Sequence, residues 1–287
     1  MKLIILFSIL FTFFSLSLFA QKKPAYKIFN AKGKKVSYQK MCKKLQSEDI
    51  VLFGEIHNNP IAHWLQLEVV LTLNQSRKMI IGAEMFERDN QKGLNQYLNN
   101  EIERKALDSL IRLWNNYSTD YEPIVEFAKT NSIPVIATNI PRRYARIVFR
   151  EGLEALEQLS PEEKEWIAPL PIAFDIELPG YKNMLTMMGD DTHSGQNFPK
   201  AQAIKDATMA FSILEHFKKE TLFLHLNGSY HSDNYEGILW YLKQQEPNLN
   251  YKTITTVSQK NIKSLAKEHL GKADFIIAVP ENMTTTY

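Results

Sequence analysis

Six short apolar runs, separated by stretches with helical periodicity, constrain the fold more than any other feature of this chain. They cover residues 50–53, 79–83, 133–137, 222–226, 251–257 and 274–279. Most of these runs are apolar on both faces, while 251–257 also contains a lysine and three threonines; runs apolar on both faces are typical of strands in a sheet that is covered on both sides. Strands that alternate with helices form mostly parallel sheets. The sequence therefore predicts an α/β fold, with a mostly parallel central sheet covered by helices on both faces.

The stretches between these runs complete the expected architecture. A small hairpin is expected at 26–38, and a helical insertion between the second and third core strands. Residues 169–198 contain several prolines and glycines, with His193 among them, and are expected to be irregular. A loop of this length in a compact domain is often functional. Helices are expected at 198–218 and 262–270, and residues 21–287 are expected to form a single domain.

The first twenty residues have the pattern of a secretory signal. Lys2 precedes an apolar run from Leu3 to Phe14, and small residues follow up to Ala20. The run is shorter than the roughly 20 residues that a membrane-spanning helix needs. We therefore expect residues 1–20 to be a signal peptide and the protein to be periplasmic, with an uncleaved anchor as the alternative. No cysteine follows the run, so a lipid anchor is not predicted.

Charge, cysteine content and missing motifs argue against several classes of function. The formal net charge is +2, without the dense basic patch of nucleic-acid-binding proteins, so no nucleic-acid partner is expected. The single cysteine, Cys42, excludes an internal disulfide and is expected to be a packed thiol. The sequence also lacks the glycine-rich loops that bind nucleotides and the His-Glu-x-x-His and Gly-x-Ser-x-Gly motifs of common hydrolases.

Polar side chains follow four of the core strands. They are Glu55 and His57; Glu84, Glu87 and Arg88; Asn139 and Arg142; and Asn227 and His231. The first and fourth of these strands both end in Gly-x-x-His. Parallel sheets bind ligands beyond the carboxyl ends of their strands, so the two motifs are expected to be halves of one site. The alternative for Glu55 and Glu84 is a structural salt bridge with Arg88 or Arg142.

Two chemistries fit these residues, and both stay open at this point. A divalent metal such as Zn or Mn could be held with one open position that activates water, as in a metal-dependent hydrolase of esters or peptides. The candidate metal ligands and catalytic residues are Glu55, His57, Glu84 and His231. Alternatively, a histidine or tyrosine would ligate a haem iron while arginines face the propionates. The candidates for that site are His57, Arg88, Arg142, His193, Tyr230 and His231.

Other polar residues have simpler interpretations. His63, His216 and His269 lie on predicted helices and are expected at the surface or in packing contacts. His225 lies inside a strand and is expected to be a hydrogen-bonded core residue. Asp206, on the helix predicted to begin near residue 198, has two interpretations: it orients a histidine of the site through a hydrogen bond, or it makes an i,i+4 or surface polar contact.

Six segments together resemble the ChaN-like haem-binding uptake family, which belongs to a superfamily with Tiki proteins, TraB proteins and erythromycin esterases. The segments are residues 54–57, 82–88, 94–98, 137–141, 201–210 and 226–231. They occur in the family's order and span most of the chain that follows the signal segment, which is far more specific than any single motif.

The resemblance implies an exported protein that binds haem and supports iron uptake. Membrane-associated uptake machinery and a second copy of the chain are the partners that it suggests. It also implies an ancestral site in which Glu55, His57, Glu84 and His231 match the Glu/His set of the hydrolytic members. Haem ligation in the family is associated with tyrosine, for which Tyr181, Tyr230 and Tyr235 are candidates. Members are often lipoproteins, and this chain departs from them by lacking the lipid-accepting cysteine.

Overall fold

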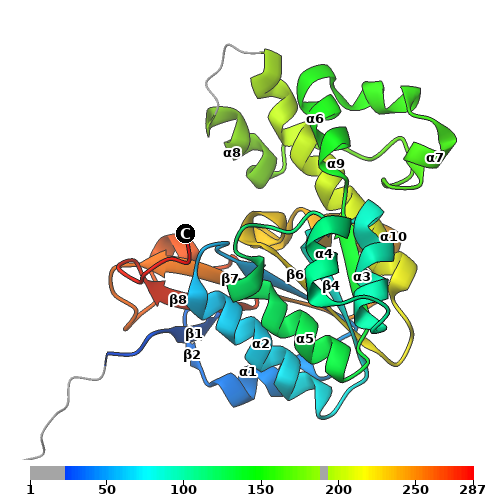
Figure 1. The fold of residues 1–287 in the computed structure, drawn as a ribbon. Helices are drawn as coiled ribbons and strands as arrows, with labels where there is room; N and C mark the ends of the chain where they lie inside the picture. The colour runs from blue at the N-terminus through cyan, green and yellow to red at the C-terminus, as the bar shows by residue number, and fades with distance from the viewer. Residues whose placement is uncertain (1–22, 188–192) are drawn as a thin grey trace, which may run out of the picture.

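The computed structural model of the chain describes residues 23–187 and 193–287 (Figure 1). Within these ranges, the side chains of residues 187 and 193–195 are not described. The expected signal segment, residues 1–20, lies outside the described residues.

Eight strands of the described residues form one sheet in the order β2-β1-β8-β7-β3-β6-β4-β5. The strands are β1 (Lys27–Asn30), β2 (Lys35–Val36), β3 (Ile50–Glu55), β4 (Met79–Glu87), β5 (Val135–Asn139), β6 (Leu222–Gly228), β7 (Tyr251–Gln259) and β8 (Phe275–Pro280). The neighbouring strands from β8 to β5 in this order pair in parallel. The hairpin is antiparallel: β1 pairs antiparallel with both β2 and β8. The predicted mostly parallel sheet and N-terminal hairpin are confirmed.

Helices connect the strands. They are α1 (Tyr38–Leu45), α2 (Pro60–Asn74), α3 (Gln91–Leu98), α4 (Arg104–Leu110), α5 (Glu122–Thr130), α6 (Arg142–Glu151), α7 (Pro161–Lys164), α8 (Pro179–Met187), α9 (His193–His216) and α10 (Ile238–Gln245). Short 3-10 helices are Arg88–Asn90, Leu153–Gln158, Ser229–His231, Asp233–Tyr235 and Lys267–His269, and Tyr117–Tyr121 is a π-helical turn. None of the helices in the described residues is long and apolar enough to cross a membrane.

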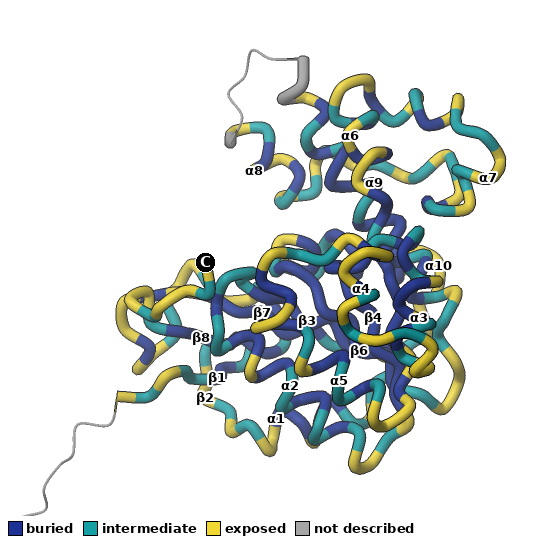
Figure 2. The backbone as a smooth tube through the Cα atoms, viewed as in Figure 1, coloured by how far each residue is buried: buried dark blue, intermediate teal, exposed yellow. Residues whose placement is uncertain are grey.

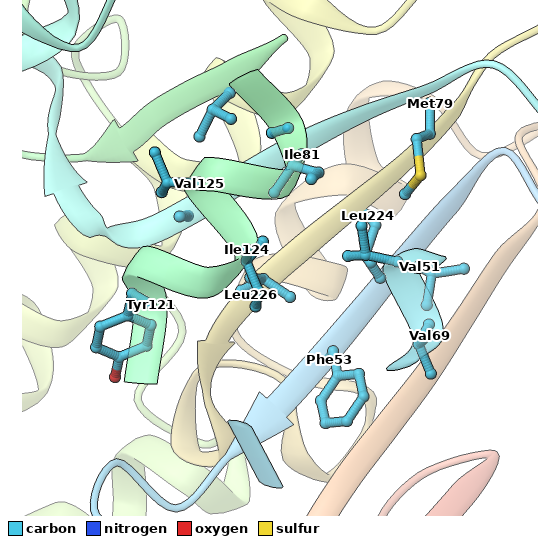
Figure 3. Close-up of a cluster of buried hydrophobic side chains, with 14 of the residues drawn as sticks. Val51, Phe53, Val69, Met79, Ile81, Tyr121, Ile124, Val125, Leu224 and Leu226 are labelled. Atoms are coloured by element: carbon cyan, nitrogen blue, oxygen red, sulfur yellow. The ribbon is translucent and has the colours of Figure 1, made fainter. Parts of the chain in front are cut away.

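The two faces of the sheet carry separate apolar cores because side chains alternate along each strand. Val51 and Phe53 of β3 pack with α1, α2 and α5, the face shown in Figure 3. Ile50 and Leu52 of the same strand pack with α9 and α10 on the opposite face. Burial on both faces explains why the strands read as continuous apolar runs, and the central strands are buried along nearly their whole length (Figure 2).

A group of helices stands over the carboxyl ends of the strands (Figure 1). We call this group the helical cap; it comprises α6, α7, α8 and the N-terminal half of α9. It has a small core of its own, in which Tyr144 and Val148 pack near Ile204. The C-terminal half of α9 leaves the cap and packs on the sheet through Met209 and Ile213. The cap is distinct from the helical insertion predicted between the second and third core strands, which is present as α3, α4 and α5.

Two expectations about local structure are wrong. Residues 262–270 do not form an α-helix and contain only the 3-10 turn Lys267–His269, because the Gln259 side chain hydrogen-bonds to the backbone there. Its Nε2 donates to the carbonyls of Asn261 and Ser264, and its Oε1 accepts from the amide of Ala266. Residues 169–198 are only partly irregular, since α8 and the first turn of α9 fall within them. A helix in that stretch places apolar side chains over the strand ends.

Candidate functional site

A cavity of about 470 Å³ lies between the strand ends and the helical cap. The register places the two Gly-x-x-His motifs side by side, because Gly54 pairs with Asn227 and Glu55 with Gly228 across β3 and β6. The strand ends supply one wall and the cap the other. The lining residues are Glu55, Ile56, His57, Glu84, Met184, Phe198, Gln202, Lys205, Gly228, Ser229, Tyr230 and His231.

Glu55, the last residue of β3, is buried and holds His57 in one orientation. Its Oε1 lies 2.9 Å from His57 Nδ1 and accepts a hydrogen bond of 2.6 Å from the Tyr121 hydroxyl. Its Oε2 accepts a 2.7 Å hydrogen bond from Gln66 Nε2. A carboxylate that faces Nδ1 fixes the proton there in the neutral imidazole, so Nε2 is the basic nitrogen.

The pKa of His57 reflects a balance between burial and charge. Burial by itself would lower this pKa, but the hydrogen bond with Glu55 and the charges of Glu84 and Glu55 outweigh it and raise the pKa above its ordinary value. The side chain remains 38% exposed. Nε2 makes no hydrogen bond within the described residues and lies against Gly228 at the cavity wall. His57 therefore presents a basic nitrogen to the cavity.

His63 supports this arrangement from behind, which corrects the expectation of a surface or packing role. Its ring is buried, with Nε2 2.9 Å from the carbonyl oxygen of His57. Nε2 is also 3.4 Å from Asp120 Oδ2, and Nδ1 is 3.5 Å from Glu55 Oε2. The side-chain amide of Asn116 donates a second bond, of 3.1 Å, to the His57 carbonyl. The sequence signal was the spacing of His63 and Gln66 on one face of α2.

His231 lies between two buried carboxylates. Its Nε2 is 3.1 Å from Glu84 Oε1, and its Nδ1 is 2.5 Å from Asp206 Oδ1. Burial opposes the charged ring, but the two carboxylates outweigh burial and raise the pKa of His231 to about 10. Burial by itself would raise the pKa of Glu84. The charge and hydrogen bond of His231 outweigh burial and hold the pKa of this carboxyl well below its usual range. The expected hydrogen bond between Asp206 and a histidine of the site is confirmed.

The loop after β6 joins the two pairs. The backbone amide of Gly228 donates a 2.7 Å hydrogen bond to Glu84 Oε2. A Cβ at Gly228 would lie only 2.7 Å from two ring atoms of His57. Only glycine lets the imidazole approach this closely without a shift of the ring. The candidate catalytic set of Glu55, His57, Glu84 and His231 is thus gathered in one place, as two hydrogen-bonded pairs.

The predicted metal ligands are engaged with each other. Both ring nitrogens of His231 face carboxylates, and Glu84 accepts from Gly228 as well as from His231. No group of three or more His, Cys, Asp or Glu side chains in the described residues is arranged to hold a metal ion. A metal with these four ligands would need the pairs to separate, so the donor set does not fit the predicted metal.

The two arginines of the predicted haem site lie elsewhere, which is a correction. Arg88 Nη1 pairs with Glu215 at 3.0 Å, and Nη2 donates to the Glu165 carbonyl. Arg142 lines a different cavity together with Glu87 and Arg112. Neither arginine contacts Glu55 or Glu84 in the described structure, so the alternative of a structural salt bridge is also wrong.

The remaining candidates lie in different surroundings. His193 begins α9, but its side chain lies outside the described residues. Tyr181 is buried, and its hydroxyl donates to Asp206 Oδ2 at 2.8 Å. Tyr235 does not line the cavity, whereas Tyr230 is 66% exposed at its rim. His225 is a hydrogen-bonded core residue as expected, with partners on Thr138 and Asn227.

Three cavity residues were missed because no polar pattern marks them. Met184 of α8 and Phe198 of α9 provide an apolar wall, and Lys205 of α9 provides a cation. Apolar residues in helices are usually interpreted as core, and a single lysine as surface. Only the packing of the cap over the strand ends shows that they face a ligand-sized cavity.

Comparison with known proteins places the chain in a family. A family model described as "Haem-binding uptake, Tiki superfamily, ChaN" matches residues 41–242. The chain is 26% identical over 192 residues to Protein RETICULATA-RELATED 5, chloroplastic, of Arabidopsis thaliana. That match covers 62% of this chain but 26% of the relative, so the chain spans about a quarter of the length of the relative.

Solved structures share the fold. A structure of ChaN from Campylobacter jejuni, described as showing cofacial haem binding, superposes with a TM-score of 0.67 at 17% identity and covers 88% of this chain and 96% of that one. An erythromycin esterase variant in its open conformation has a TM-score of 0.52 at 8% identity and covers 92% and 99%. These similarities show the same α/β architecture. Together with the family match over residues 41–242, they lead to one conclusion: the chain belongs to the haem-binding uptake family of the Tiki superfamily that is named for ChaN.

Proposed function

We propose that this protein binds haem in the cavity between the strand ends and the helical cap. One observation carries the proposal: His57 directs Nε2, which has no hydrogen-bond partner among the described residues, into a cavity that is apolar on the cap side. Haem iron takes an axial nitrogen or oxygen donor, and the porphyrin needs an apolar surface. Membership of a haem-binding family supports this ligand over other aromatic molecules.

The residues of the cavity fit such a ligand. Ile56, Met184 and Phe198 offer apolar contacts, and Lys205 offers a cation to a carboxylate. Two side chains could bind the iron, namely His57 through Nε2 and Tyr230 through its exposed hydroxyl. We assign the axial ligand to His57, because the hydrogen bond to Glu55 orients its ring and increases the basicity of Nε2.

A haemin titration of the protein, followed at the Soret band, tests both statements. We expect saturable binding by the wild type and a loss of affinity of roughly tenfold or more in His57→Ala, corresponding to one lost ligand bond. His216→Ala is the matched control, because His216 lies at the end of α9 outside the cavity. An absence of saturable binding by the wild type contradicts the proposal. A loss in Tyr230→Phe and not in His57→Ala moves the ligand to Tyr230.

We also propose that the protein is exported and supplies haem to a membrane-associated uptake machinery. The pattern of residues 1–20 supports export, and the family name supports uptake. Cell fractionation with mass determination of the purified protein tests the first part. We expect the periplasmic fraction to contain a protein whose mass corresponds to a chain beginning at Gln21. An intact chain found in the cytoplasm contradicts export.

Hydrolysis is the second candidate function, and the Glu55–His57 pair favours it. A carboxylate on Nδ1 and an available Nε2 at a cavity is the arrangement of a general base that activates water. In this case the Glu84–His231 pair would hold the loop after β6 at the cavity wall, beside His57. Hydrolysis of a chromogenic ester that is lost in His57→Ala and kept in His216→Ala supports this candidate, whereas equal rates in both variants contradict it.

A further inference from the structure

The segment after β8, residues 281–287, lies against the loop that follows β3. Most of its side chains are exposed, whereas Thr286 is partly buried. The amide of Thr286 donates a 3.0 Å hydrogen bond to the carbonyl of Asn58, the residue after His57. Its hydroxyl donates a 2.8 Å hydrogen bond to Asp120 Oδ2. Thr286 therefore holds this segment beside His57 through both its backbone and its side chain.

Asp120 is a buried carboxylate that gathers several donors. The residue is 4% exposed. Besides the Thr286 hydroxyl, its Oδ2 accepts a 2.6 Å hydrogen bond from the side-chain amide of Asn116 and lies 3.4 Å from His63 Nε2. Burial of a carboxylate is unfavourable unless donors satisfy its oxygens. Loss of the Thr286 hydroxyl would therefore change the position of Asp120 and its contacts with these two neighbours.

The same two neighbours of Asp120 also hold the backbone of His57. Asn116 Nδ2 donates a 3.1 Å hydrogen bond to the carbonyl oxygen of His57, and His63 Nε2 lies 2.9 Å from that oxygen. The amide of Asn116 has two N–H groups, so one can face Asp120 and the other His57. A shift of Asp120 thus reaches the His57 carbonyl through a single intervening side chain.

The π-helical turn Tyr117–Tyr121 carries this support to the ring of His57 as well. Its last residue, Tyr121, donates a 2.6 Å hydrogen bond to Glu55 Oε1, the atom that faces His57 Nδ1. π-helical turns often occur at functional sites. Asp120 and Tyr121 hold the backbone and the ring of His57 from one turn, so a contact that anchors this turn also acts on His57.

We propose that Thr286 is a positioning residue for His57. Its hydroxyl fixes Asp120 and its amide fixes the carbonyl of Asn58, and together they set the direction in which His57 presents Nε2 to the cavity. As a statement about ligand binding, the inference rests on the proposed function, in which His57 contacts the ligand. Thr286 does not line the cavity, so it acts on the ligand through His57.

Three variants at two threonines test this role. Thr286→Val removes the hydroxyl with little change of shape, Thr286→Ser keeps the hydroxyl, and Thr284→Val makes the same change at an exposed control position. The first readout is the proton NMR signal of the His57 ring in the protein without haemin, assigned by its absence in His57→Ala. We expect Thr286→Val to shift this signal, whereas Thr286→Ser and Thr284→Val should leave it as in the wild type.

Haemin titration at the Soret band gives the second readout. Thr286→Val should weaken haemin binding by roughly threefold, less than the loss of a group that contacts a metal ligand directly, because Thr286 acts through intervening side chains. In a His57→Ala background the same change should add almost nothing, since both changes act on one contact to the ligand. A shifted His57 signal with unchanged haemin affinity overturns the role of Thr286 in binding, while haem binding stands.

Thermal unfolding separates positioning from folding. An unmoved His57 signal in folded Thr286→Val contradicts the inference even if the midpoint falls, because Thr286 then only stabilises the fold. A shift that Thr286→Ser shows as well contradicts it too, since the hydroxyl is then not the cause. If the wild type does not bind haemin, the proposed function fails, while the His57 signal still decides whether Thr286 positions this residue.

Discussion

His57 and His231 differ in how many of their ring nitrogens are engaged. His231 has a carboxylate at each nitrogen, whereas His57 has one at Nδ1 only. A ring held at both ends is fixed in place and has no nitrogen left for a ligand. We therefore interpret His231 as the residue that organises the loop after β6, and His57 as the residue that acts on the ligand.

The stability contributed by His231 is expected to depend on pH. Its pKa rises from 6.5 in the unfolded chain to about 10 in the folded protein. The folded protein thus holds a proton that the unfolded chain releases, so this contribution is complete below pH 6.5 and declines as the pH rises to 10. His231→Gln should lower the free energy of unfolding at pH 6 by roughly 3–5 kcal/mol, since two buried carboxylates lose their partner.

Urea unfolding of wild type and His231→Gln at pH 6, 8 and 10 measures this effect. The difference between the two proteins should shrink steadily across the series. His216→Gln, at a partly exposed histidine, serves as the control and should show little change. A difference that stays constant or grows with pH contradicts the assignment of a charged ring.

Gly228 sets the position of the His57 ring, so Gly228→Ala should affect the ligand more than the fold. The new Cβ would overlap the ring tip, and a partly exposed side chain can swing away at small cost in stability. Haemin affinity should fall by roughly the factor seen in His57→Ala, about tenfold. In a His57→Ala background the glycine substitution should add almost nothing, because the two changes share one cause. Additive losses would contradict this account.

Individual residues of the site could be predicted where they follow strands. Glu55, His57, Glu84 and His231 were found because the carboxyl ends of neighbouring parallel strands meet. His63 was not found, since its spacing to Gln66 on one helix face does not reveal the carboxylate that both side chains contact. Arg88 and Arg142 were placed wrongly, because a position near a strand end does not say which way a long side chain points: Arg88 pairs with Glu215, and Arg142 lines another cavity.

Among the elements, α2 has the clearest link between its sequence and the site. Asn59 and Pro60 begin the helix, and the Asn59 side chain accepts a 3.0 Å hydrogen bond from the amide of Ala62. The next turn presents His63 and Gln66 to Glu55. The start of this helix therefore fixes the groups that orient His57.

Asn59→Ala should destabilise the protein by about 1 kcal/mol, the usual cost of a lost N-cap, and should weaken haemin binding as well. Asn59→Asp keeps the acceptor and should restore most of the stability. Urea unfolding and the Soret titration on the same preparations give both quantities. Ser37→Ala removes the N-cap of α1, far from the cavity in sequence, and should change stability alone. Equal effects of the two N-cap variants on binding would contradict the link.

Element boundaries were harder to predict than element types. The core strands were recognised from their apolar runs, but β4 extends to Glu87 where a strand ending at residue 83 was expected. The helix expected at 262–270 is reduced to the 3-10 turn Lys267–His269, because the side chain of Gln259 occupies backbone groups that an α-helix would need. Periodicity does not report such a competition between side chain and backbone.

For the whole molecule, the sequence predicted the strand-end side of the site but not the helical cap that forms its other side. The strand ends carry titratable groups at fixed spacing, which a sequence displays directly. The cap wall is formed by Met184, Phe198 and Lys205, which come together only through the packing of α8 and α9 over the sheet. Such contacts between segments have no local signature, so they could not be predicted from one sequence.

The continuity of α9 has a mechanical consequence. With 24 residues, the helix is about 36 Å long. Gln202, Lys205 and Asp206 at the cavity share this rod with Met209 and Ile213, which are anchored in the core of the sheet. A helix resists bending, so this wall of the cavity is held rigidly by the part of α9 that is packed in the core. The helix can bend most easily at Pro199, which has no backbone N–H to donate. We therefore expect any movement of the cap on ligand binding to occur at Pro199 and in α8.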